Sequence, residues 1–274
     1  MTRVTLVVEN TTRSAGLLAE HGLSLWIDTG RHRVLFDCGQ GMAMPHNAER
    51  LGIDLGSADA IVLSHGHYDH VGGLEHALEA APHAALWLHP DARQRKFRQL
   101  DDGGAKRLST DFVEAGEFGE REVRYARDPA EVVAGVWLSG EIPRVHSDED
   151  TGGPFFRDQA LSQPDPLADD MALIIDCGEA LGVVFGCAHA GAMNTLDHIR
   201  RQHRGRPVHT LLGGLHLANA GRRRLDATCA YLRELGPRCA GFCHCTGRAA
   251  LCRLAAALPE SFTETSCGTS MEIP

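Results

Sequence analysis

The sequence has no excess of basic residues and no long hydrophobic run. Lys and Arg total 27 against 36 Asp and Glu, which gives a formal net charge of -9. This balance argues against a general affinity for nucleic acid or for an anionic membrane surface, and it favours a small-molecule partner. No apolar stretch approaches the roughly 18 residues that a membrane-spanning helix needs, so we expect a soluble protein.

A secretory leader and a disulfide framework are also missing. The first residues, MTRVTLVVEN, show no charged leader followed by an apolar core and a cleavage site. The nine cysteines are odd in number and lie singly or in one C-terminal group, Cys239, Cys243 and Cys245. We therefore expect reduced thiols and a cytoplasmic location. The length of 274 residues allows a substantial core, and we expect a single domain over 1–274.

Short β-branched or aromatic-rich runs alternate with stretches that have apolar residues at helical spacing. The first kind predicts strands and the second kind helices. Strands are expected over 4–8, 23–27, 32–37, 60–64 and 85–89, and helices over 74–81, 194–203, 222–236 and 248–258. The sequence DTGR within 23–37 is typical of a hairpin turn. Hairpins together with separate helices predict a layered α+β architecture rather than a doubly wound parallel sheet.

Two parts of the chain resemble each other. SLWIDTG at 24–30 and VLFDCG at 34–39 are matched by ALIIDCG at 172–178 and GVVFGC at 182–187. Two halves that each open on a hairpin would form two sheets packed face to face; the alternative is that short hairpins look alike by chance. The stretch between them, about 100–166, is rich in Asp, Gly and Pro, and we expect a loop or lid region there.

A cluster of metal-ligand residues occupies LSHGHYDHVGGL at 63–74. In an extended turn, His65 and His67 would point the same way, and Asp69 and His70 would emerge after the chain has turned. Two such neighbouring pairs suit two metal ions better than one. The alternative is a polar turn with solvated histidines. However, imidazoles packed this closely repel one another when protonated and contribute little to core packing.

These residues resemble the HxHxDH signature of the metallo-β-lactamase fold superfamily. The stretches FDCGQG, GCAHAG, GGLHL, CHCTG and CGTSMEI extend the resemblance over most of the chain. Within the superfamily, EHGLSLWI and SGEIPR look like the branch that includes the archaeal dihydropterin synthase of methanopterin biosynthesis and many bacterial metallo-hydrolases. The resemblance implies a four-layer αβ/βα sandwich, with two mixed β-sheets face to face, helices outside, and a site where the sheets end.

The resemblance also implies the metal ligands. His65 and His67 match the ligands of a first metal ion, and Asp69 and His70 match those of a second. His189 is expected to complete the first set and His244 the second, although each could be a structural histidine at a strand end. Asp69 would also be catalytic, because it would orient the attacking hydroxide. The two divalent ions would be Zn2+, with Fe2+ or Mn2+ as alternatives.

The bridging acid that is usual in the superfamily has no clear counterpart, so the second ion could be weakly held. Asp170, Cys187 and His216 are candidates for a metal or substrate contact. For Cys187 a buried apolar thiol is the favoured alternative, and for Asp170 the alternative is a strand cap. The C-terminal cysteine group could instead form a separate structural zinc site, which is the weaker hypothesis.

Four further residues are candidates for substrate binding. His21 follows Glu20 in EHGLS, and Glu141 and Arg144 lie in GEIPR. The guanidinium of Arg144 suits a carboxylate or a phosphate. The alternative for these residues is a solvated salt bridge.

The sequence therefore predicts a metal-dependent hydrolase of a small, anionic substrate. The substrate would be an ester, a lactone or a phosphodiester, and a metal-bound hydroxide would be the nucleophile. One alternative is a dihydropterin-condensing transferase, and another is a metal-binding sensor without turnover. Hydrolysis that chelation abolishes would favour the enzyme, whereas no turnover at full metal loading would favour the sensor.

Overall fold

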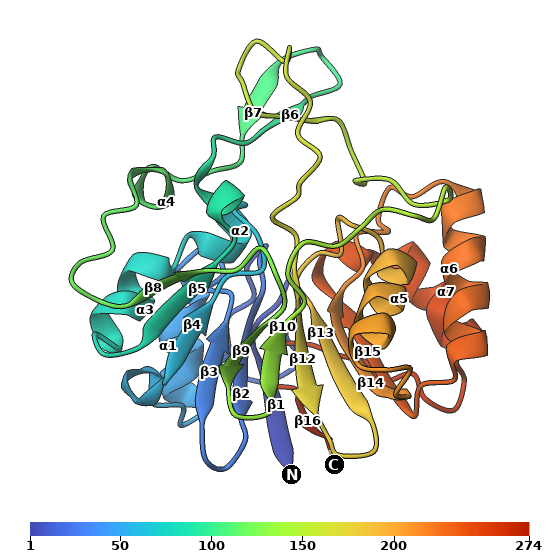
Figure 1. Ribbon diagram of the computed structural model, residues 1–274, viewed down its shortest axis with the longest axis horizontal. Coiled ribbons are helices and arrows are strands. Elements are labelled where there is room, and N and C mark those ends of the chain that lie inside the picture. The colour runs from blue at the N-terminus through green and yellow to red at the C-terminus, as the bar shows by residue number, and fades with distance from the viewer. Residues whose placement is uncertain (274) are drawn as a thin grey trace.

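The computed structural model describes residues 1–273 and contains two large β-sheets with helices on their outer faces (Figure 1). The strands of the large sheets are β1 Thr2–Val8, β2 Ser24–Asp28, β3 Arg33–Phe36, β4 Ala60–Val62, β5 Ala85–Leu88, β8 Val123–Tyr125, β9 Ala130–Val133, β10 Val136–Leu138, β12 Ala172–Asp176, β13 Leu181–Phe185, β14 Val208–Gly214, β15 Cys239–Cys243 and β16 Ser270–Ile273. The α-helices are α1 Ala43–Arg50, α2 Tyr68–Val71, α3 Leu74–Ala80, α4 Asp111–Ala115, α5 Ala192–Gln202, α6 Arg222–Leu235 and α7 Arg248–Ala257. The first sheet has the order β16-β1-β2-β3-β4-β5-β8 and the second the order β15-β14-β13-β12-β10-β9.

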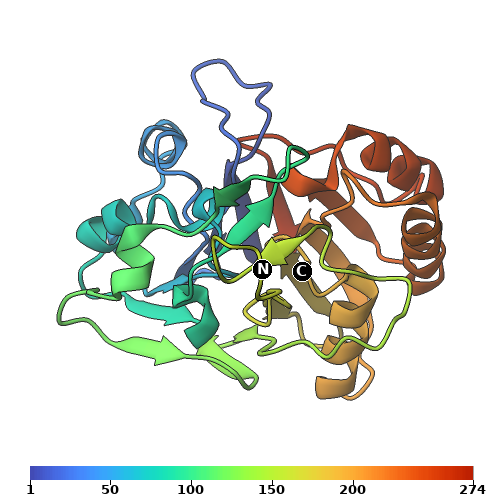
Figure 2. The same cartoon turned by 90° about the horizontal axis from the view of Figure 1, so that it is seen from above.

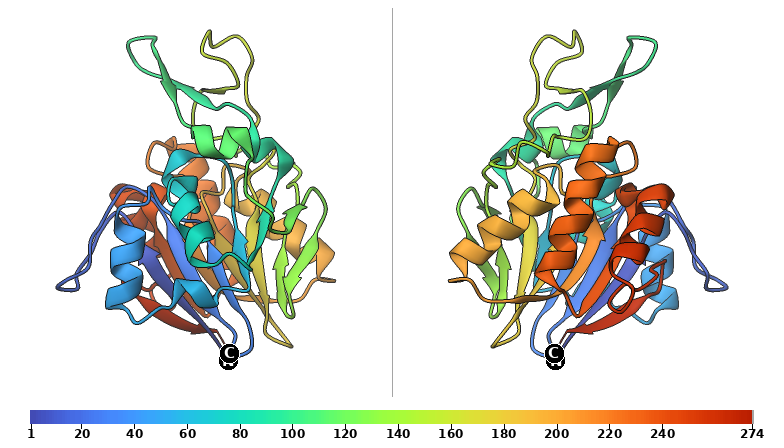
Figure 3. Two further views of the ribbon diagram at one scale, coloured as in Figure 1. Left: turned by 90° about the vertical axis from the view of Figure 1, so that its left-hand side faces the viewer. Right: turned by 90° about the vertical axis from the view of Figure 1, so that its right-hand side faces the viewer.

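Alternating side chains divide the interior into layers. In β2, Leu25 and Ile27 point between the two sheets, whereas Trp26 points to the helices outside the first sheet. This alternation is the period of two that a strand buried on both faces requires. Helices α1 and α3 cover the first sheet, and α5, α6 and α7 cover the second (Figures 2 and 3). The predicted α+β sandwich is therefore confirmed.

The two halves of the chain repeat one topology. The antiparallel hairpin β2–β3 is followed by β4 and β5, which continue parallel to β3. The hairpin β12–β13 is followed in the same way by the parallel strands β14 and β15. The sequence similarity between the halves thus reflects a structural repeat. As a result, the loops after β4, β13 and β15 meet at one end of the sandwich.

The segment 100–166 contains more regular structure than the sequence predicts. Strands β8, β9 and β10 join the large sheets, and α4 is a short helix. Strands β6 Phe97–Gln99, β7 Ala105–Arg107 and β11 Phe155–Phe156 form a separate three-stranded sheet. We call these three strands the small sheet; β6 and β7 stand above α2 in Figure 1. Its strands are too short and too polar to show a clear alternation in the sequence.

Helices that could cross a lipid bilayer are not found in residues 1–273, because none is both long and apolar enough.

Candidate metal centre

The histidine-rich loop runs from the end of β4 into α2. His67 is still extended, with φ -80° and ψ 142°, and α2 begins at the next residue and carries Asp69 and His70. The start of a helix, rather than an extended turn, therefore separates the two pairs of candidate ligands. Gly66 serves close packing rather than flexibility, because a Cβ there would lie 2.2 Å from the carbonyl oxygen of Ala92.

The first set of candidate ligands is His65, His67 and His189. Their ligand nitrogens lie within 4.8 Å of one another, and His65 Nε2 is 3.0 Å from His67 Nδ1. Two nitrogens bound to one tetrahedral zinc ion at about 2.0–2.1 Å lie about 3.3 Å apart, so this spacing suits a shared ion. The Nε2 atom of His189 is buried and has no hydrogen-bond partner within residues 1–273. These donors fit one divalent cation.

The second set is Asp69, His70 and His244. The Nε2 atoms of His70 and His244 are 3.1 Å apart, although the residues are 174 positions apart in the chain. Asp69 Oδ2 lies 3.5 Å from His244 Nε2 and 4.0 Å from His70 Nε2. The structure thus brings all six predicted ligands into two adjacent sets. His21 joins the second set, with its Nε2 atom 3.2 Å from Asp69 Oδ2.

Four of the histidines present Nε2 to the centre because their Nδ1 atoms are already paired. A metal-binding histidine commonly donates its other ring N–H to an oxygen in this way, which fixes both the tautomer and the ring orientation. The four pairs, 2.7 to 2.9 Å long, are His65 with Ser64 Oγ, His70 with Asp37 Oδ2, His189 with the carbonyl oxygen of Thr151, and His244 with Asn10 Oδ1.

Asp37 is a supporting residue that the sequence analysis missed. It follows β3, is fully buried, and has the left-handed φ of 59°. Its carboxylate accepts hydrogen bonds from the backbone N–H and the hydroxyl of Ser64 and from Nδ1 of His70, each over 2.7 Å. A carboxylate at the end of the strand next to the histidine loop was the signal that could have identified it.

The protonation states of the first set and of Asp69 suit cation binding. Burial lowers the pKa of His65 and His189 well below the usual value and lowers that of His67 to about 3. Burial would raise the pKa of Asp69, but its hydrogen bonds to His21 and His244 outweigh burial and keep that pKa low. Neutral imidazoles and an ionised carboxylate are the forms that bind a divalent metal.

A buried ion cluster supports the loop from the side of the small sheet. Lys96 is only 1% exposed, and its Nζ lies 2.8 Å from Asp169 Oδ1 and 3.1 Å from Asp165 Oδ2. The other oxygen of Asp169 accepts a hydrogen bond from the Gly66 N–H over 2.8 Å. The cluster therefore links the chain that enters β6 to the histidine loop. The sequence did not reveal it, because Lys96 lies in a stretch of charged residues that looks solvent-exposed.

Phe155 of β11 covers the first set. Its ring centroid lies 5.4 Å from that of His67 and 5.2 Å from that of His189. The side chain is 6% exposed, so the small sheet places an aromatic ring between these histidines and solvent.

Two of the weaker candidates lie at the centre. Cys187 Sγ is 3.1 Å from His70 Nε2, and the His216 ring centroid is 4.2 Å from that of His189. The C-terminal cysteines do not form a separate site. Cys243 lies in the core between the sheets, whereas Cys245 lies beside Cys187 and His244.

Asp170 and Arg144 support the loop that carries His189, rather than facing the centre. Asp170 accepts a hydrogen bond from the Ala190 N–H over 2.8 Å, and burial raises its pKa to about 6. Arg144 donates to the carbonyl oxygens of His189 and Leu167 over 2.6 and 3.2 Å. Backbone oxygens thus already engage the Arg144 guanidinium, and its role as a substrate contact stays a prediction.

Glu141 and Glu20 contact groups outside the two ligand sets, and their role as substrate contacts stays a prediction. Glu141 Oε2 lies 3.8 Å from His89 Nε2 and 3.7 Å from Arg127 Nη1, outside the two ligand sets. Glu20 accepts hydrogen bonds from four successive backbone N–H groups, from Gln40 to Ala43, where α1 begins. Unpaired N–H groups at a helix start attract a carboxylate, which explains its position.

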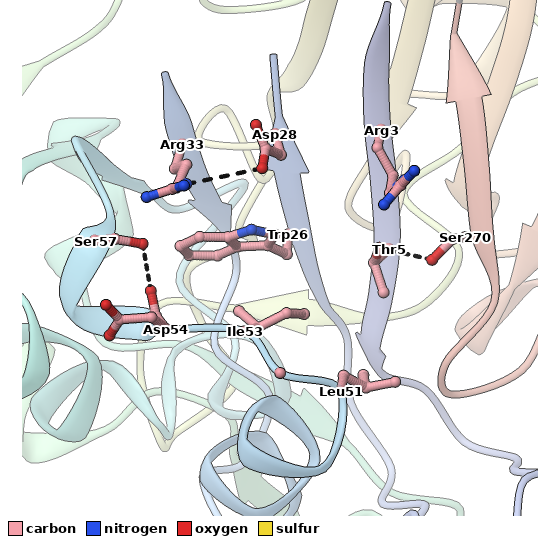
Figure 4. A pocket seen from close by; sticks show the side chains of 11 residues that line it. Arg3, Thr5, Trp26, Asp28, Arg33, Leu51, Ile53, Asp54, Ser57 and Ser270 are labelled. Carbon is pink, nitrogen blue, oxygen red and sulfur yellow. Dashed lines mark hydrogen bonds and ion pairs between the residues drawn. The ribbon is translucent and has the colours of Figure 1, made fainter. Parts of the chain in front are cut away.

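A cavity of about 400 Å³ lies elsewhere, on the outer face of the first sheet (Figure 4). Arg3, Trp26 and Arg33 help to line it, and none of the ligand-set residues does. Both arginines are paired with acids, Arg3 with Glu272 over 2.8 Å and Arg33 with Asp28 over 3.7 Å. We assign no chemistry to this cavity.

Comparisons with known proteins agree with this geometry. Residues 18–158, just over half of the chain, match the model of the metallo-beta-lactamase superfamily. Two relatives come from Methanocaldococcus jannaschii. The uncharacterized protein MJ0448 is 28% identical, over 92% of this chain and 93% of its own length. The 7,8-dihydropterin-6-methyl-4-(beta-D-ribofuranosyl)-aminobenzene-5'-phosphate synthase is 29% identical, over 84% of this chain and 82% of its own length.

A solved structure from the same superfamily also resembles this chain. Tm1679, described as a metal-dependent hydrolase of the beta-lactamase superfamily, superposes with a TM-score of 0.85 at 26% identity. The match covers 100% of this chain and 99% of that one. From its histidine loop, its two-sheet sandwich and these matches, we conclude that the chain belongs to the metallo-β-lactamase superfamily.

Proposed function

We propose that the protein is a metal-dependent hydrolase of a small, anionic substrate such as an ester, a lactone or a phosphodiester. The observation that carries this proposal is the convergence of two sets of buried donors, in which four histidines present Nε2 inward. A fold does not establish a reaction by itself, whereas the donor atoms of the site limit the chemistry that is possible there.

In this proposal, the first ion is held by His65, His67 and His189, and the second by Asp69, His70 and His244. Imidazole and carboxylate ligands suit Zn2+, with Fe2+ and Mn2+ as alternatives. When bound, such ions lower the pKa of water from about 15.7 towards about 7 and polarise the carbonyl or phosphoryl group under attack.

The protein's own residues orient the reactants. Asp69 stays ionised and can accept a hydrogen bond from the attacking water. His21, whose side chain is 56% exposed, lies beside Asp69 and can donate to a substrate oxygen. Lys106 of β7 donates to the Tyr68 hydroxyl over 3.3 Å, which places a positive charge beside α2 and favours an anionic substrate. Phe155 excludes water from the first set.

A second candidate function is a condensing transferase. The archaeal relative named as a dihydropterin synthase is 29% identical over most of both chains, which supports this alternative. A metal-binding sensor without turnover is the third candidate. The three differ in what happens to water, because only a hydrolase must place a solvent oxygen in its product.

The deciding experiment is turnover in oxygen-18 water. The metal-loaded protein would be given a panel of esters, lactones and phosphodiesters, and the acid product analysed by mass spectrometry. We expect label in the product, no turnover after chelation or in His67→Ala, and full activity in His76→Ala, an exposed control on α3. Activity retained in His67→Ala would indicate a contaminating enzyme.

Each competing function predicts a different result in the same assay. Product formed only from a pterin together with an aromatic amine, without solvent label, would support the transferase. No turnover of any substrate at full metal loading would support the sensor.

A further inference from the structure

We propose that Cys187 and Cys245 supply thiolate ligands to the centre, so that a nitrogen–sulfur donor set takes the place of a bridging acid. The inference depends on the proposed metal binding but not on hydrolysis.

Cys187 occupies the position between the two ligand sets. Its Sγ lies within 4.8 Å of ligand nitrogens of His65 and His70, and a second such group joins it to His189 and His216. The shortest of these contacts, to His70 Nε2, is 3.1 Å. A sulfur that contacts donors of both sets is in the position that a bridging ligand needs.

The surroundings of Cys187 differ from those of a structural thiol. Cys229 and Cys243, both buried, are members of apolar core clusters, with Cys229 on α6 and Cys243 between the sheets. Cys187 is 2% exposed but belongs to none of the core clusters in the described part of the chain, and it faces imidazole nitrogens. The expectation of a small apolar core thiol therefore does not describe its environment.

Cys245 lies next to Cys187. His244 adopts the left-handed φ of 52°, which ends β15 and turns both His244 and Cys245 toward the centre. Cys187 Sγ, Cys245 Sγ and a His244 ring nitrogen lie within 4.8 Å of one another. Space for this sulfur exists because residue 214 is glycine; a Cβ there would lie 2.6 Å from Cys245 Sγ.

An unpartnered nitrogen supports a ligand at this place. His216 Nδ1 is buried and has no hydrogen-bond partner within residues 1–273, although its ring packs against His189. The His216 backbone N–H donates to Cys245 Sγ over 3.2 Å, which orients that sulfur as an acceptor. His216 Nδ1 is thus a buried nitrogen without a hydrogen-bond partner among the described residues, on a residue that lies close to both Cys187 and Cys245.

Thiolates would change the metal preference. Asp69 is the only carboxylate in the described ligand sets, whereas two thiolates would bring the ligand charge to -3 against the +4 of two divalent ions. Each thiol would release its proton to solvent as the metal–sulfur bond forms. Because soft sulfur ligands favour zinc over manganese or magnesium, we expect zinc to be retained most strongly.

X-ray absorption of the zinc-loaded wild-type protein tests the inference directly. We expect a sulfur shell at about 2.3 Å in addition to a nitrogen and oxygen shell at about 2.0–2.2 Å. A spectrum with only the shorter shell at full zinc loading would overturn the proposal. This measurement needs no variant, so it decides the question even if substitutions impair folding.

Cobalt substitution identifies the two residues. The Co(II) protein should show near-ultraviolet thiolate-to-cobalt charge-transfer absorption, which should weaken in Cys187→Ser and in Cys245→Ser and vanish in the double variant. Zinc affinity should fall by more than about tenfold in each single variant. The matched control is Cys252→Ser, because Cys252 is exposed on α7, and it should retain both signals.

Wild-type absorption and affinity in the double variant would refute the assignment. Failure of the hydrolase proposal would have a different signature: a zinc–sulfur shell in a protein that hydrolyses no substrate. Conversely, hydrolysis without a sulfur shell would overturn only the thiolate ligands.

Discussion

Asp37 accepts a hydrogen bond from Nδ1 of His70 over 2.7 Å, and both side chains are fully shielded from solvent. The contact fixes the His70 tautomer and directs Nε2 toward His244 Nε2, 3.1 Å away. Asp37 lies in the first hairpin of the chain, whereas His244 lies near the end. A residue that binds no metal thus determines whether the second ligand set is assembled.

Replacement of Asp37 should therefore weaken binding of the second ion most. We expect Asp37→Ala to lower the affinity for the second ion by about 10–100-fold and to lower the affinity for the first ion less, because Asp37 reaches His65 only through Ser64. A competition titration against a chromophoric chelator measures both affinities. Asp37→Asn keeps an oxygen acceptor, so its affinity for the second ion should fall less. Equal affinities in the wild type and Asp37→Ala would show that His70 needs no such partner.

The division into two sets predicts metal content. His67→Ala and His70→Ala should each fold and each lose at least one metal equivalent by elemental analysis, because they belong to different sets. His244→Ala should behave like His70→Ala. The exposed His76→Ala is the control and should keep the wild-type content. Full metal content in all three site variants would mean that the ions bind elsewhere.

The buried Lys96 cluster predicts a large effect on stability. Lys96→Met leaves Asp169 buried without its cation and leaves Asp165 with only Arg157, whose Nε lies 3.5 Å from Oδ1. Loss of one partner of a buried ion pair typically costs about 3–5 kcal/mol. Denaturant unfolding of chelator-treated protein measures this loss without a contribution from bound metal. An exposed ion pair contributes only about 0–1 kcal/mol to the free energy of unfolding. A loss within that range would contradict the burial of the cluster.

The same cluster predicts that the Asp169 contribution to the free energy of unfolding depends on pH in opposite directions in the wild type and in Lys96→Met. Burial would raise the pKa of Asp169, but Lys96 outweighs burial and lowers it. In the wild type, this contribution is present above the ordinary Asp pKa of about 3.9 and is lost as the pH falls through the lower folded value. In Lys96→Met, we expect burial, the largest influence, to outweigh the remaining hydrogen bond from the Gly66 N–H and to raise the pKa of Asp169. The free energy of unfolding of this variant should therefore rise as the pH falls toward 4. Parallel pH profiles for the two proteins would refute this.

Substitution of Arg144 distinguishes a role in supporting the His189 loop from a role in binding substrate. Its guanidinium donates to the carbonyl oxygens of His189 and Leu167, so Arg144→Ala should lower the affinity of the first ion. Arg144→Lys should rescue little, because an ammonium cannot reproduce the planar fork of donors. Metal titration checks both variants. Unchanged metal affinity with a raised KM for an anionic substrate would instead restore Arg144 as a substrate contact.

The sequence revealed the parts of this protein that follow local rules. Strand alternation located β1 to β5 of the first sheet, the resemblance between the two halves indicated β12 and β13 of the second, and helical spacing located α3, α5, α6 and α7. The spacing from His65 to His70 identified the ligand loop. Contacts between distant segments were not predictable in this way. Asp37, Asn10 and Lys96 act through partners far away in the chain, and no local pattern marks a lysine as buried.

The 174 positions between His70 and His244 give the centre a second role. An ion held by both residues would close most of the chain into a loop, as a long-range disulfide does, and would restrict the unfolded chain. Since the ion binds only when both halves are packed together, its binding energy would be added to their association. The centre would then act as a cross-link between the two halves, and the supply of metal would determine how stably they pack against each other.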